Sequence, residues 1–192
     1  GTDTIKIERV ASLHGFDHPV MFDRIEAGTY MTAVAATGGE LLLKGANVNI
    51  ISSLVSKLTG SGASIRFEGD QLLVTAPNRL NPIDIKTAPY PGFPTDMQAQ
   101  FMALNTIANG TSTVSETIFE NRFMHVQELN RLGAKIEIQG NMAVVKGVSS
   151  LTGAEVMATD LRASAGLVIA GLIATNETTI GRIYHLDRGY ER

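Results

Sequence analysis

The 192-residue chain contains no cysteine and no tryptophan. The absence of cysteine excludes disulfides, thiolate metal sites and a thiol nucleophile supplied by this chain. Basic side chains number 16 and acidic ones 19, which gives a formal net charge of −3. There is no bulk positive field to attract nucleic acid or anionic lipid, so any anionic ligand has to meet a local site. We therefore expect neither a nucleic-acid partner nor membrane insertion.

Long hydrophobic runs are also missing. The longest strongly apolar stretch, residues 167–174, is too short to span a bilayer, and no basic segment followed by an apolar one opens the chain. We therefore expect a cytoplasmic protein. The four histidines show no metal-ligand spacing, and the Gly-Ser-Gly segment at 60–62 is not followed by the Gly-Lys-Ser/Thr of a phosphate loop. We expect no metal, no cofactor and no nucleoside triphosphatase.

The sequence does contain internal repeats. A shift of 71 residues aligns seven identical pairs within about twenty positions. The pairs are Val55 and Val126, Leu58 and Leu129, Gly62 and Gly133, Ala63 and Ala134, Ile65 and Ile136, Gly69 and Gly140, and Val74 and Val145. A second shift, of 64 residues, places Thr95-Asp96 on Thr159-Asp160. The chain therefore holds more than two copies of one unit.

The hydrophobic periodicity and turn residues predict that this unit is βαβαββ. In the first copy we expect a strand at 5–10, a helix from 23 to the glycines at 38–39, a strand at 41–44, a helix at 49–58 and a hairpin of strands 64–67 and 72–76. In the second we expect a strand at 83–87, a helix at 96–108, a strand at 113–118, a helix at 123–132 and a hairpin of strands 134–138 and 142–146. The third provides a strand at 155–158, a helix at 161–173 and a strand at 178–183, and the chain stops at Arg192 before a second helix.

The expected fold is α/β, an inside-out α/β barrel of repeated βαβαββ units with pseudo-threefold symmetry and a truncated third repeat. The helices that begin at Asp96 and Leu161 are rich in Ala, Gly, Met and Leu and have few charged positions on any face, which is typical of helices buried all round. Sheets would then lie outside a helical core. We expect a single domain over 1–192, with two complete repeats, at about 1–80 and 81–150, and a partial one over 151–192.

The segment before the second inner helix is the first candidate for chemistry. Residues 88–100 contain three prolines and a glycine, which make the approach to the helix rigid. We expect Thr95 to cap the helix with Gln98 reaching back, which leaves Asp96 in the first turn. The ordinary explanation is that an acid in this position only stabilises the helix dipole. Spacing alone favours that explanation.

Three arginines form the second candidate set. Arg122, Arg162 and Arg188 each lie near a strand-to-helix or loop-to-helix junction, where anion-binding groups gather. The guanidinium fork suits carboxylate and phosphate. An isolated arginine usually pairs with a nearby acid, here Asp160 or Asp187, and for any one of the three that explanation is the stronger.

Four longer motifs carry a family resemblance. They are residues 93–100 (Phe-Pro-Thr-Asp-Met-Gln-Ala-Gln), 119–125 (Phe-Glu-Asn-Arg-Phe-Met-His), 158–164 (Ala-Thr-Asp-Leu-Arg-Ala-Ser) and 182–192 (Arg-Ile-Tyr-His-Leu-Asp-Arg-Gly-Tyr-Glu-Arg). Together they resemble the UDP-N-acetylglucosamine 1-carboxyvinyltransferases, the enolpyruvyl transferases that begin peptidoglycan synthesis. The resemblance extends over essentially the whole chain. That family has an inside-out α/β barrel of βαβαββ units, in agreement with the repeat.

The resemblance implies a metal-free transfer of the enolpyruvyl group from phosphoenolpyruvate to the sugar 3-hydroxyl. By resemblance, Asp96 contacts the sugar and is the base for the hydroxyl proton, and Ile118 touches the UDP-sugar chiefly through its backbone. Arg162 and Arg188 help to hold phosphoenolpyruvate, with Arg122 at the edge of the site and Asp160 in a secondary role. Phosphoenolpyruvate carries a carboxylate and a phosphate, which suits converging guanidinium groups.

The resemblance also implies a fragment. The family's active site lies between two domains, and this chain resembles only the carboxyl-terminal one, with Gly1-Thr2-Asp3 resembling the interior of the parent. The second catalytic domain, with the cysteine or aspartate that protonates C3, is then absent and the chain alone is inactive. Two alternatives remain: a domain of 3-phosphoshikimate 1-carboxyvinyltransferase, which the motif at 93–100 argues against, and a folded scaffold without catalysis.

Overall fold

The computed structural model describes residues 4–190, and its elements follow the expected repeat. The first unit contains α1 (Arg24–Thr37), β1 (Glu40–Lys44), α2 (Ser52–Gly60), β2 (Ser64–Glu68) and β3 (Gln71–Thr75). The second contains β4 (Ile85–Lys86), the 3-10 helix η1 (Thr95–Met97), α3 (Gln98–Asn105), β5 (Thr111–Ser115), α4 (His125–Arg131), β6 (Lys135–Gln139) and β7 (Met142–Lys146). The third contains β9 (Glu155–Met157), α5 (Leu161–Ile173), β11 (Thr179–Gly181) and the 3-10 helix η2 (Ile183–His185).

The sheets show the same topology in each unit. The first sheet has the order β1-β3-β2 and the second the order β4-β5-β7-β6, so β5-β7-β6 matches β1-β3-β2. In the second unit β4 pairs parallel with β5, and in the third β9 pairs parallel with β11. The equivalent glycines also share a backbone conformation that L-residues rarely adopt. The φ angles are 101° and 91° at Gly62 and Gly133, and 65° and 62° at Gly69 and Gly140. The first two units thus share the order of three strands and the conformation of their turn glycines.

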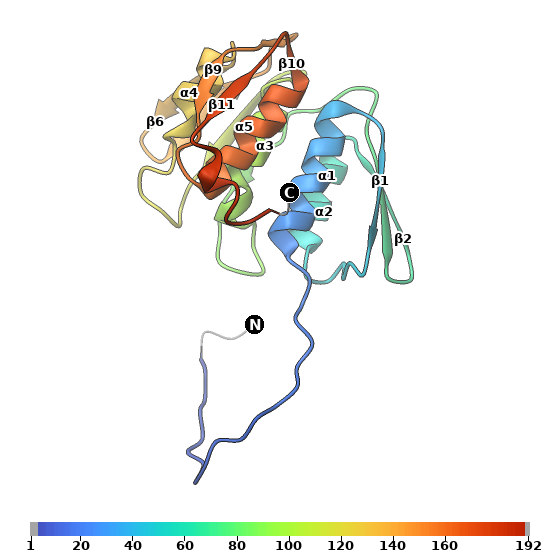
Figure 1. Cartoon of the computed structure of the whole chain (residues 1–192). Coiled ribbons are helices and arrows are strands. Elements are labelled where there is room, and N and C mark those ends of the chain that lie inside the picture. The colour runs from blue at the N-terminus through green and yellow to red at the C-terminus, as the bar shows by residue number, and fades with distance from the viewer. Residues whose placement is uncertain (1–3, 191–192) are drawn as a thin grey trace.

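Three helices form the centre of the molecule. Helices α1, α3 and α5 pack against one another, and the strands lie outside them (Figure 1). The approach of α3 and α5 is close because Gly166 lacks a side chain: a Cβ built there would lie 2.8 Å from the carbonyl oxygen of Ala99. All eight residues of α3 are buried, including the amides Gln98, Gln100 and Asn105, as the absence of charged residues from this helix predicts. Residues 4–190 do not form a closed barrel, so closure remains an expectation.

The expected strand at 5–10 is wrong. This segment has no regular structure and belongs to an extended arm that leaves the body of the molecule (Figure 1). Ile5 and Ile7 are each 87% exposed. Alternation of apolar and polar residues is enough for a strand only when a neighbouring strand accepts its backbone hydrogen bonds, and none lies beside this segment in the described structure. In the second unit β4 pairs with β5, but among the described residues no strand lies at the corresponding edge of β1.

Other boundaries differ by a few residues. The second helix starts at Ser52, after a turn in which the backbone N–H groups of Ile50 and Ile51 donate to residues 47 and 48. Strand β5 ends at Ser115 rather than at residue 118. A short parallel pair, β8 (Leu151–Thr152) with β10 (Ala174–Thr175), was not predicted from the sequence because two residues give no periodicity. The positions 1–3 and 191–192 used above lie outside the described residues.

Candidate active site

The three candidate arginines come together at one pocket. It has a volume of about 690 Å³ and lies where the loop after β5, the start of α5 and the segment after η2 converge. Its lining residues are Asp96, Phe119, Glu120, Asn121, Arg122, Met124, Asp160, Leu161, Arg162, His185 and Arg188. The pocket therefore collects five of the six residues that the sequence singled out. Ile118 is not part of the lining, although its neighbour Phe119 is.

Asp96 lies between two of these arginines. Its Oδ1 is 3.0 Å from Nη2 of Arg122, and its Oδ2 is 3.7 Å from Nε of Arg162. The three side chains are only partly exposed, with 39% of Asp96, 21% of Arg122 and 19% of Arg162 accessible to solvent. Each oxygen of the carboxylate thus faces a different guanidinium group, at a position that solvent still reaches.

Asp96 is not a helix cap, unlike the aspartates at the starts of the other two inner helices. Asp23 accepts hydrogen bonds from the backbone N–H groups of residues 25 and 26 at the start of α1, and Asp160 accepts from those of residues 162 and 163 at the start of α5. In the second unit the cap position falls on Pro94, two residues before Asp96, and has no side-chain hydrogen bond; the 3-10 turn begins at Thr95. The Asp96 carboxylate is therefore free to meet the arginines.

The role expected for Thr95 is wrong, and the structure gives the reason. Its hydroxyl does not cap the helix but donates to Oε2 of Glu116 at 2.8 Å, and accepts from Nη1 of Arg122 at 2.8 Å. Gln98 does not reach back to the cap either, because its Nε2 donates to the carbonyl oxygen of Arg122 at 3.1 Å. Both side chains fix the loop after β5 rather than the helix start.

Glu116, which the sequence analysis did not single out, is buried beneath the pocket and only 2% exposed. Burial by itself would raise the pKa of this carboxyl, but hydrogen bonds from the Ile118 N–H, Thr87, Thr95 and the Phe119 N–H outweigh it and lower the pKa below the ordinary value. Glu116 is therefore an anion near neutral pH. A single glutamate that ends a strand carries no pattern that periodicity could detect.

The loop that carries Arg122 is held in a specific conformation. Asn121 has a φ of 57°, a left-handed conformation that asparagine tolerates better than most residues. The guanidinium of Arg122 lies 5.0 Å from the ring centroid of Phe119, in the geometry of a cation–π contact. Together with the bond from Gln98, these contacts direct Arg122 towards Asp96.

His125 is a second residue that the sequence analysis left aside. It begins α4, is 3% exposed, and its Nε2 has no hydrogen-bond partner among the described residues. Burial lowers the pKa of His125 to about 4; the Asp160 charge opposes this shift and the Arg122 charge adds to it. The imidazole is therefore neutral at physiological pH and adds no charge behind the pocket.

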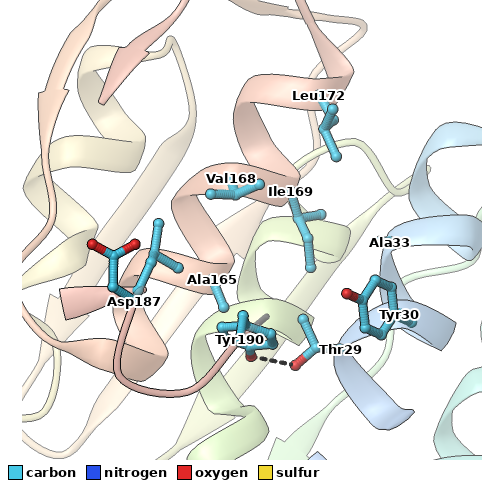
Figure 2. A pocket seen from close by; sticks show the side chains of 10 residues that line it. Thr29, Tyr30, Ala33, Ala165, Val168, Ile169, Leu172, Asp187 and Tyr190 are labelled. Atoms are coloured by element: carbon cyan, nitrogen blue, oxygen red, sulfur yellow. Dashed lines mark hydrogen bonds between the residues drawn. The ribbon is translucent and has the colours of Figure 1, made fainter. Parts of the chain in front are cut away.

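Arg188 reaches the pocket on the segment that follows η2. Two residues further on, the hydroxyl of Tyr190 lies 3.0 Å from Oγ1 of Thr29 in α1 (Figure 2). That hydroxyl group of Thr29 also accepts from Nε2 of Gln100 in α3 at 3.1 Å. Through the Thr29 hydroxyl group, hydrogen bonds connect the segment that carries Arg188 to α1 and, indirectly, to α3.

A second pocket, mainly apolar and of about 580 Å³, lies between α1 and α5 (Figure 2). Val168, Ile169 and Leu172 of α5 line one side, and Tyr30 and Ala33 of α1 line the other. Leu172 is 63% exposed and Tyr30 is 46% exposed. Since this pocket offers few groups for catalysis, it resembles an uncovered packing surface more than a reaction site.

The polar pocket suits a ligand with more than one negative charge. Arg122, Arg162 and Arg188 converge on it, and guanidinium forks bind carboxylates and phosphates with well-defined geometry. Asp96 is the one carboxylate there that contacts two of these arginines, so an anion that takes over the arginines would release it. Among residues 4–190 no cluster of His, Asp or Glu could hold a metal ion, and no helix is long and apolar enough to cross a membrane.

Comparison with known proteins agrees with this chemistry. The whole chain, residues 1–192, matches the family described as EPSP synthase (3-phosphoshikimate 1-carboxyvinyltransferase). The crystal structure of the enolpyruvyl transferase NikO from Streptomyces tendae superposes with a TM-score of 0.77 at 27% sequence identity. The match covers 88% of this chain and 40% of NikO.

A more distant structure shows the same fold. The EPSP synthase of Acinetobacter baumannii superposes with a TM-score of 0.61 at 13% identity, over 81% of this chain and 38% of that enzyme. The chain thus spans about two fifths of the length of the solved structures that it matches.

Proposed function

The chain belongs to the EPSP synthase family of enolpyruvyl transferases, and we propose that it supplies one half of the active site of a UDP-N-acetylglucosamine 1-carboxyvinyltransferase. The reaction is the transfer of the enolpyruvyl group of phosphoenolpyruvate to the 3-hydroxyl of UDP-N-acetylglucosamine, the first committed step of peptidoglycan synthesis. The observation that carries the proposal is the carboxylate of Asp96 held between Arg122 and Arg162 in a pocket that Arg188 also reaches. Both substrates are metabolites of the cytoplasm, which supports a cytoplasmic location.

The proposed roles follow from these contacts. Arg162 and Arg188 bind the carboxylate and phosphate of phosphoenolpyruvate, and Arg122 binds at the edge of the site. As the anion draws the guanidinium groups towards itself, the Asp96 carboxylate is released to accept the proton of the sugar 3-hydroxyl. Asp160 holds the first turn of α5, through its bonds to the backbone N–H groups of Arg162 and Ala163, and so keeps Arg162 in place.

The chemistry is an addition followed by an elimination. The sugar oxygen forms a bond to C2 of phosphoenolpyruvate while Asp96 takes the hydroxyl proton, and C3 receives a proton from a donor. The C2–O bond to phosphate then breaks and a proton leaves C3, which restores the double bond and yields the enolpyruvyl ether and inorganic phosphate. The arginines stabilise the negative charge on phosphate and carboxylate throughout.

The proton donor for C3 belongs to a second domain in this proposal. The chain has no cysteine, and the matched region covers only 40% of NikO. We therefore expect the chain to need a complementary polypeptide for turnover. In the complete enzyme the three inner helices would form the core of an inside-out barrel with pseudo-threefold symmetry.

The contacts between units support that completion. The outer helix of each unit reaches the next unit: Lys57 of α2 donates to the carbonyl oxygen of Asp84, and Arg131 of α4 donates to that of Glu155. A third outer helix in the same relation would reach the first unit, on the side of α1. Leu172 and Tyr30 of the apolar pocket between α1 and α5 are exposed, and we propose that this pocket receives the element.

The alternative acceptor is shikimate 3-phosphate, since the family takes its name from the enzyme that uses it. The motif at residues 93–100 favours the UDP-sugar. Neither the family match nor NikO, which is described as an enolpyruvyl transferase, decides between the two acceptors.

Calorimetric titration and reconstitution test the proposal. UDP-N-acetylglucosamine is titrated into the 192-residue chain and binding heat is recorded. The chain is then mixed with the remaining domain of such a transferase, phosphoenolpyruvate and either acceptor, and phosphate release is measured. Release with UDP-N-acetylglucosamine only in the mixture is the expected result. Release with shikimate 3-phosphate instead would establish the alternative, and no release with either would leave a folded scaffold.

A further inference from the structure

The buried carboxylate of Glu116 joins three segments that meet beneath the pocket. Its Oε1 accepts hydrogen bonds from Oγ1 of Thr87 at 2.7 Å and from the backbone N–H groups of Ile118 and Phe119 at 2.8 and 3.2 Å. Its Oε2 accepts from Oγ1 of Thr95 at 2.8 Å. One side chain thus connects the end of β4, the start of η1 and the loop after β5.

These segments carry the proposed sugar site. Thr95 precedes Asp96, and its hydroxyl group accepts from the same Arg122 whose other nitrogen pairs with Asp96. Ile118 and Phe119 lie on the loop that leads to Arg122. A continuous chain of contacts therefore runs from Glu116 through Thr95 to Arg122 and then to Asp96.

We propose that Glu116 is a positioning residue of the transferase site, which holds Asp96, Arg122 and the backbone of Ile118 in one arrangement before the substrates bind. The inference rests on the proposed function and extends it. Glu116 acts through Thr95 and the loop and does not itself touch substrate, since it is 2% exposed. As a charged acceptor it makes stronger hydrogen bonds than a neutral group would, and it forms four of them.

The substitution Glu116→Gln replaces only one of the two carboxylate oxygens, so it affects the partners of Oε1 and Oε2 differently. The amide oxygen can replace Oε1 and keep the bonds to Thr87, Ile118 and Phe119. The amide nitrogen is then turned towards Thr95, where it donates to an oxygen that already accepts from Arg122, and the Thr95 hydroxyl proton loses its acceptor. The change therefore loosens the link to Arg122 and Asp96 while the rest of the network persists.

Asp84 offers a matched control at the other end of the same strand pair. It precedes β4, and its Oδ1 accepts from the backbone N–H and the hydroxyl of Thr113 in β5 at 2.7 and 2.9 Å. Asp84→Asn is again a change from carboxylate to amide in a bridge between β4 and β5. Asp84 lies outside the pocket, so Asp84→Asn shows the effect of losing a carboxylate that bridges two strands without any change in the pocket.

The experiment measures UDP-N-acetylglucosamine binding to the wild-type chain and both variants by calorimetry, together with melting temperatures and a crystal structure of each variant. We expect Kd to rise about tenfold or more in Glu116→Gln. We expect Asp84→Asn to bind like the wild type and to melt near its temperature. Glu116→Gln should melt at a lower temperature, because it loses a buried carboxylate that accepts four hydrogen bonds, whereas Asp84 is exposed. The crystal structure of Glu116→Gln should show Arg122 displaced from Asp96. Thr95→Val breaks the same link without altering Glu116 and should weaken binding similarly, which covers the case that Glu116→Gln does not fold.

The outcomes separate this inference from the proposed function. If the wild type binds the nucleotide sugar and Glu116→Gln binds it equally well, Glu116 is only structural and the proposed function stands. Weaker binding with an unchanged Asp96–Arg122 pair would also overturn the positioning role. If the wild-type chain does not bind the nucleotide sugar alone, the same titrations are made in the mixture with the remaining domain. If there is no binding in the mixture either, the proposed function fails, and the assignment of Glu116 to its site fails with it.

Discussion

At the scale of single residues, Asp96 differs from the aspartates at the starts of the other two inner helices. Three units place an aspartate at the start of an inner helix, and two of these, Asp23 and Asp160, serve as caps. The third, Asp96, does not cap its helix and instead pairs with Arg122 and Arg162. Capping by a side chain stabilises a helix. The second unit lacks this contact and directs the Asp96 carboxylate into a pocket instead, which indicates that the carboxylate has a function.

The substitution Asp96→Asn tests that use in the reconstituted two-domain enzyme. The amide keeps the shape but cannot accept the hydroxyl proton, so we expect kcat to fall by about 10² to 10⁴. The KM for the nucleotide sugar should change much less. Steady-state phosphate release gives both values.

Asp23→Asn is the matched control for this prediction. Asparagine caps a helix about as well as aspartate does, so kcat and the melting temperature should stay near the wild-type values. A near-normal kcat in Asp96→Asn would return Asp96 to the role of an ordinary acid in a first turn.

A second prediction concerns His125 and pH. Its pKa is about 4 in the folded chain, against an ordinary value of 6.5, so below pH 6.5 the unfolded chain takes up a proton that the folded chain does not. The free energy of unfolding should therefore fall as the pH drops from 6.5 to 4. A fall of the pKa of His125 from 6.5 to about 4 corresponds to a loss of about 3 kcal/mol in the free energy of unfolding.

Urea unfolding at several pH values measures this slope. His125→Leu should flatten it between pH 6.5 and 4. The acid sensitivity from Glu116, whose pKa is lowered, should remain, since that contribution is lost only as the pH falls below its ordinary value of 4.5. An unchanged slope between pH 6.5 and 4 in His125→Leu would contradict the assignment.

The sequence located the charged residues of the pocket better than the contacts among them. Asp96, Arg122 and Arg162 lie within a few residues of a helix start, which a sequence pattern can locate. The roles of Thr95 and Glu116 depend instead on a hydrogen bond between segments 21 residues apart. Glu116 resembles any other acid at the end of a strand, and only the folded chain shows that it is buried and bonded.

At the scale of elements, the packing of α3 against α5 depends on one missing side chain. A Cβ on Gly166 would lie 2.8 Å from the carbonyl oxygen and 2.9 Å from the carbonyl carbon of Ala99. Backbone atoms cannot rotate away as a long side chain can. The two helices would have to move apart, and both carry groups that face the candidate site at their amino ends.

Gly166→Ala should therefore destabilise the chain by about 1–3 kcal/mol, the range for forcing extra atoms into a packed core. Urea unfolding provides the measurement. Gly60→Ala at the end of α2 is the control, because nothing lies within 4 Å of a Cβ there and its φ is not positive. It should be neutral or stabilise by about 0.4–1 kcal/mol through the unfolded state. Equal stabilities for the two variants would contradict the close approach.

Element prediction succeeded where the periodicity was long or where glycines set the turns. Helix α5 begins and ends where the sequence predicted, because Asp160 gives a clear start and the thirteen residues that follow are apolar or small except for Arg162. The alternating segment at 5–10 failed because a strand needs a partner that the local sequence does not specify. The pairing of β8 with β10 depends on segments 23 residues apart and on two residues from each.

At the scale of the whole molecule, the open side of the helical core and the candidate site are distinct surfaces. The polar pocket is built from the second unit, the start of α5 and the segment after η2. The second, apolar pocket, called the groove below, lies between α1 and α5 (Figure 2). Tyr190 connects them, since it lines the groove while the nearby Arg188 lines the pocket. An element that fills the groove would therefore also contact Tyr190, on the segment that carries Arg188.

Leu172→Glu tests whether the groove receives part of the complementary polypeptide. Leu172 lines the groove and is 63% exposed, so a charge there should leave the isolated chain folded, with an unchanged circular dichroism spectrum. If the groove is filled on assembly, the charge would be buried without a partner. The concentration of complementary polypeptide needed for half-maximal phosphate release should then rise, roughly 10- to 100-fold for losing the burial of one leucine. Leu42→Glu, at a 46% exposed position on β1 outside the groove, should assemble like the wild type. Equal assembly of both variants would show that the groove stays open in the complete enzyme and that Arg188 is positioned by the Tyr190 contact alone.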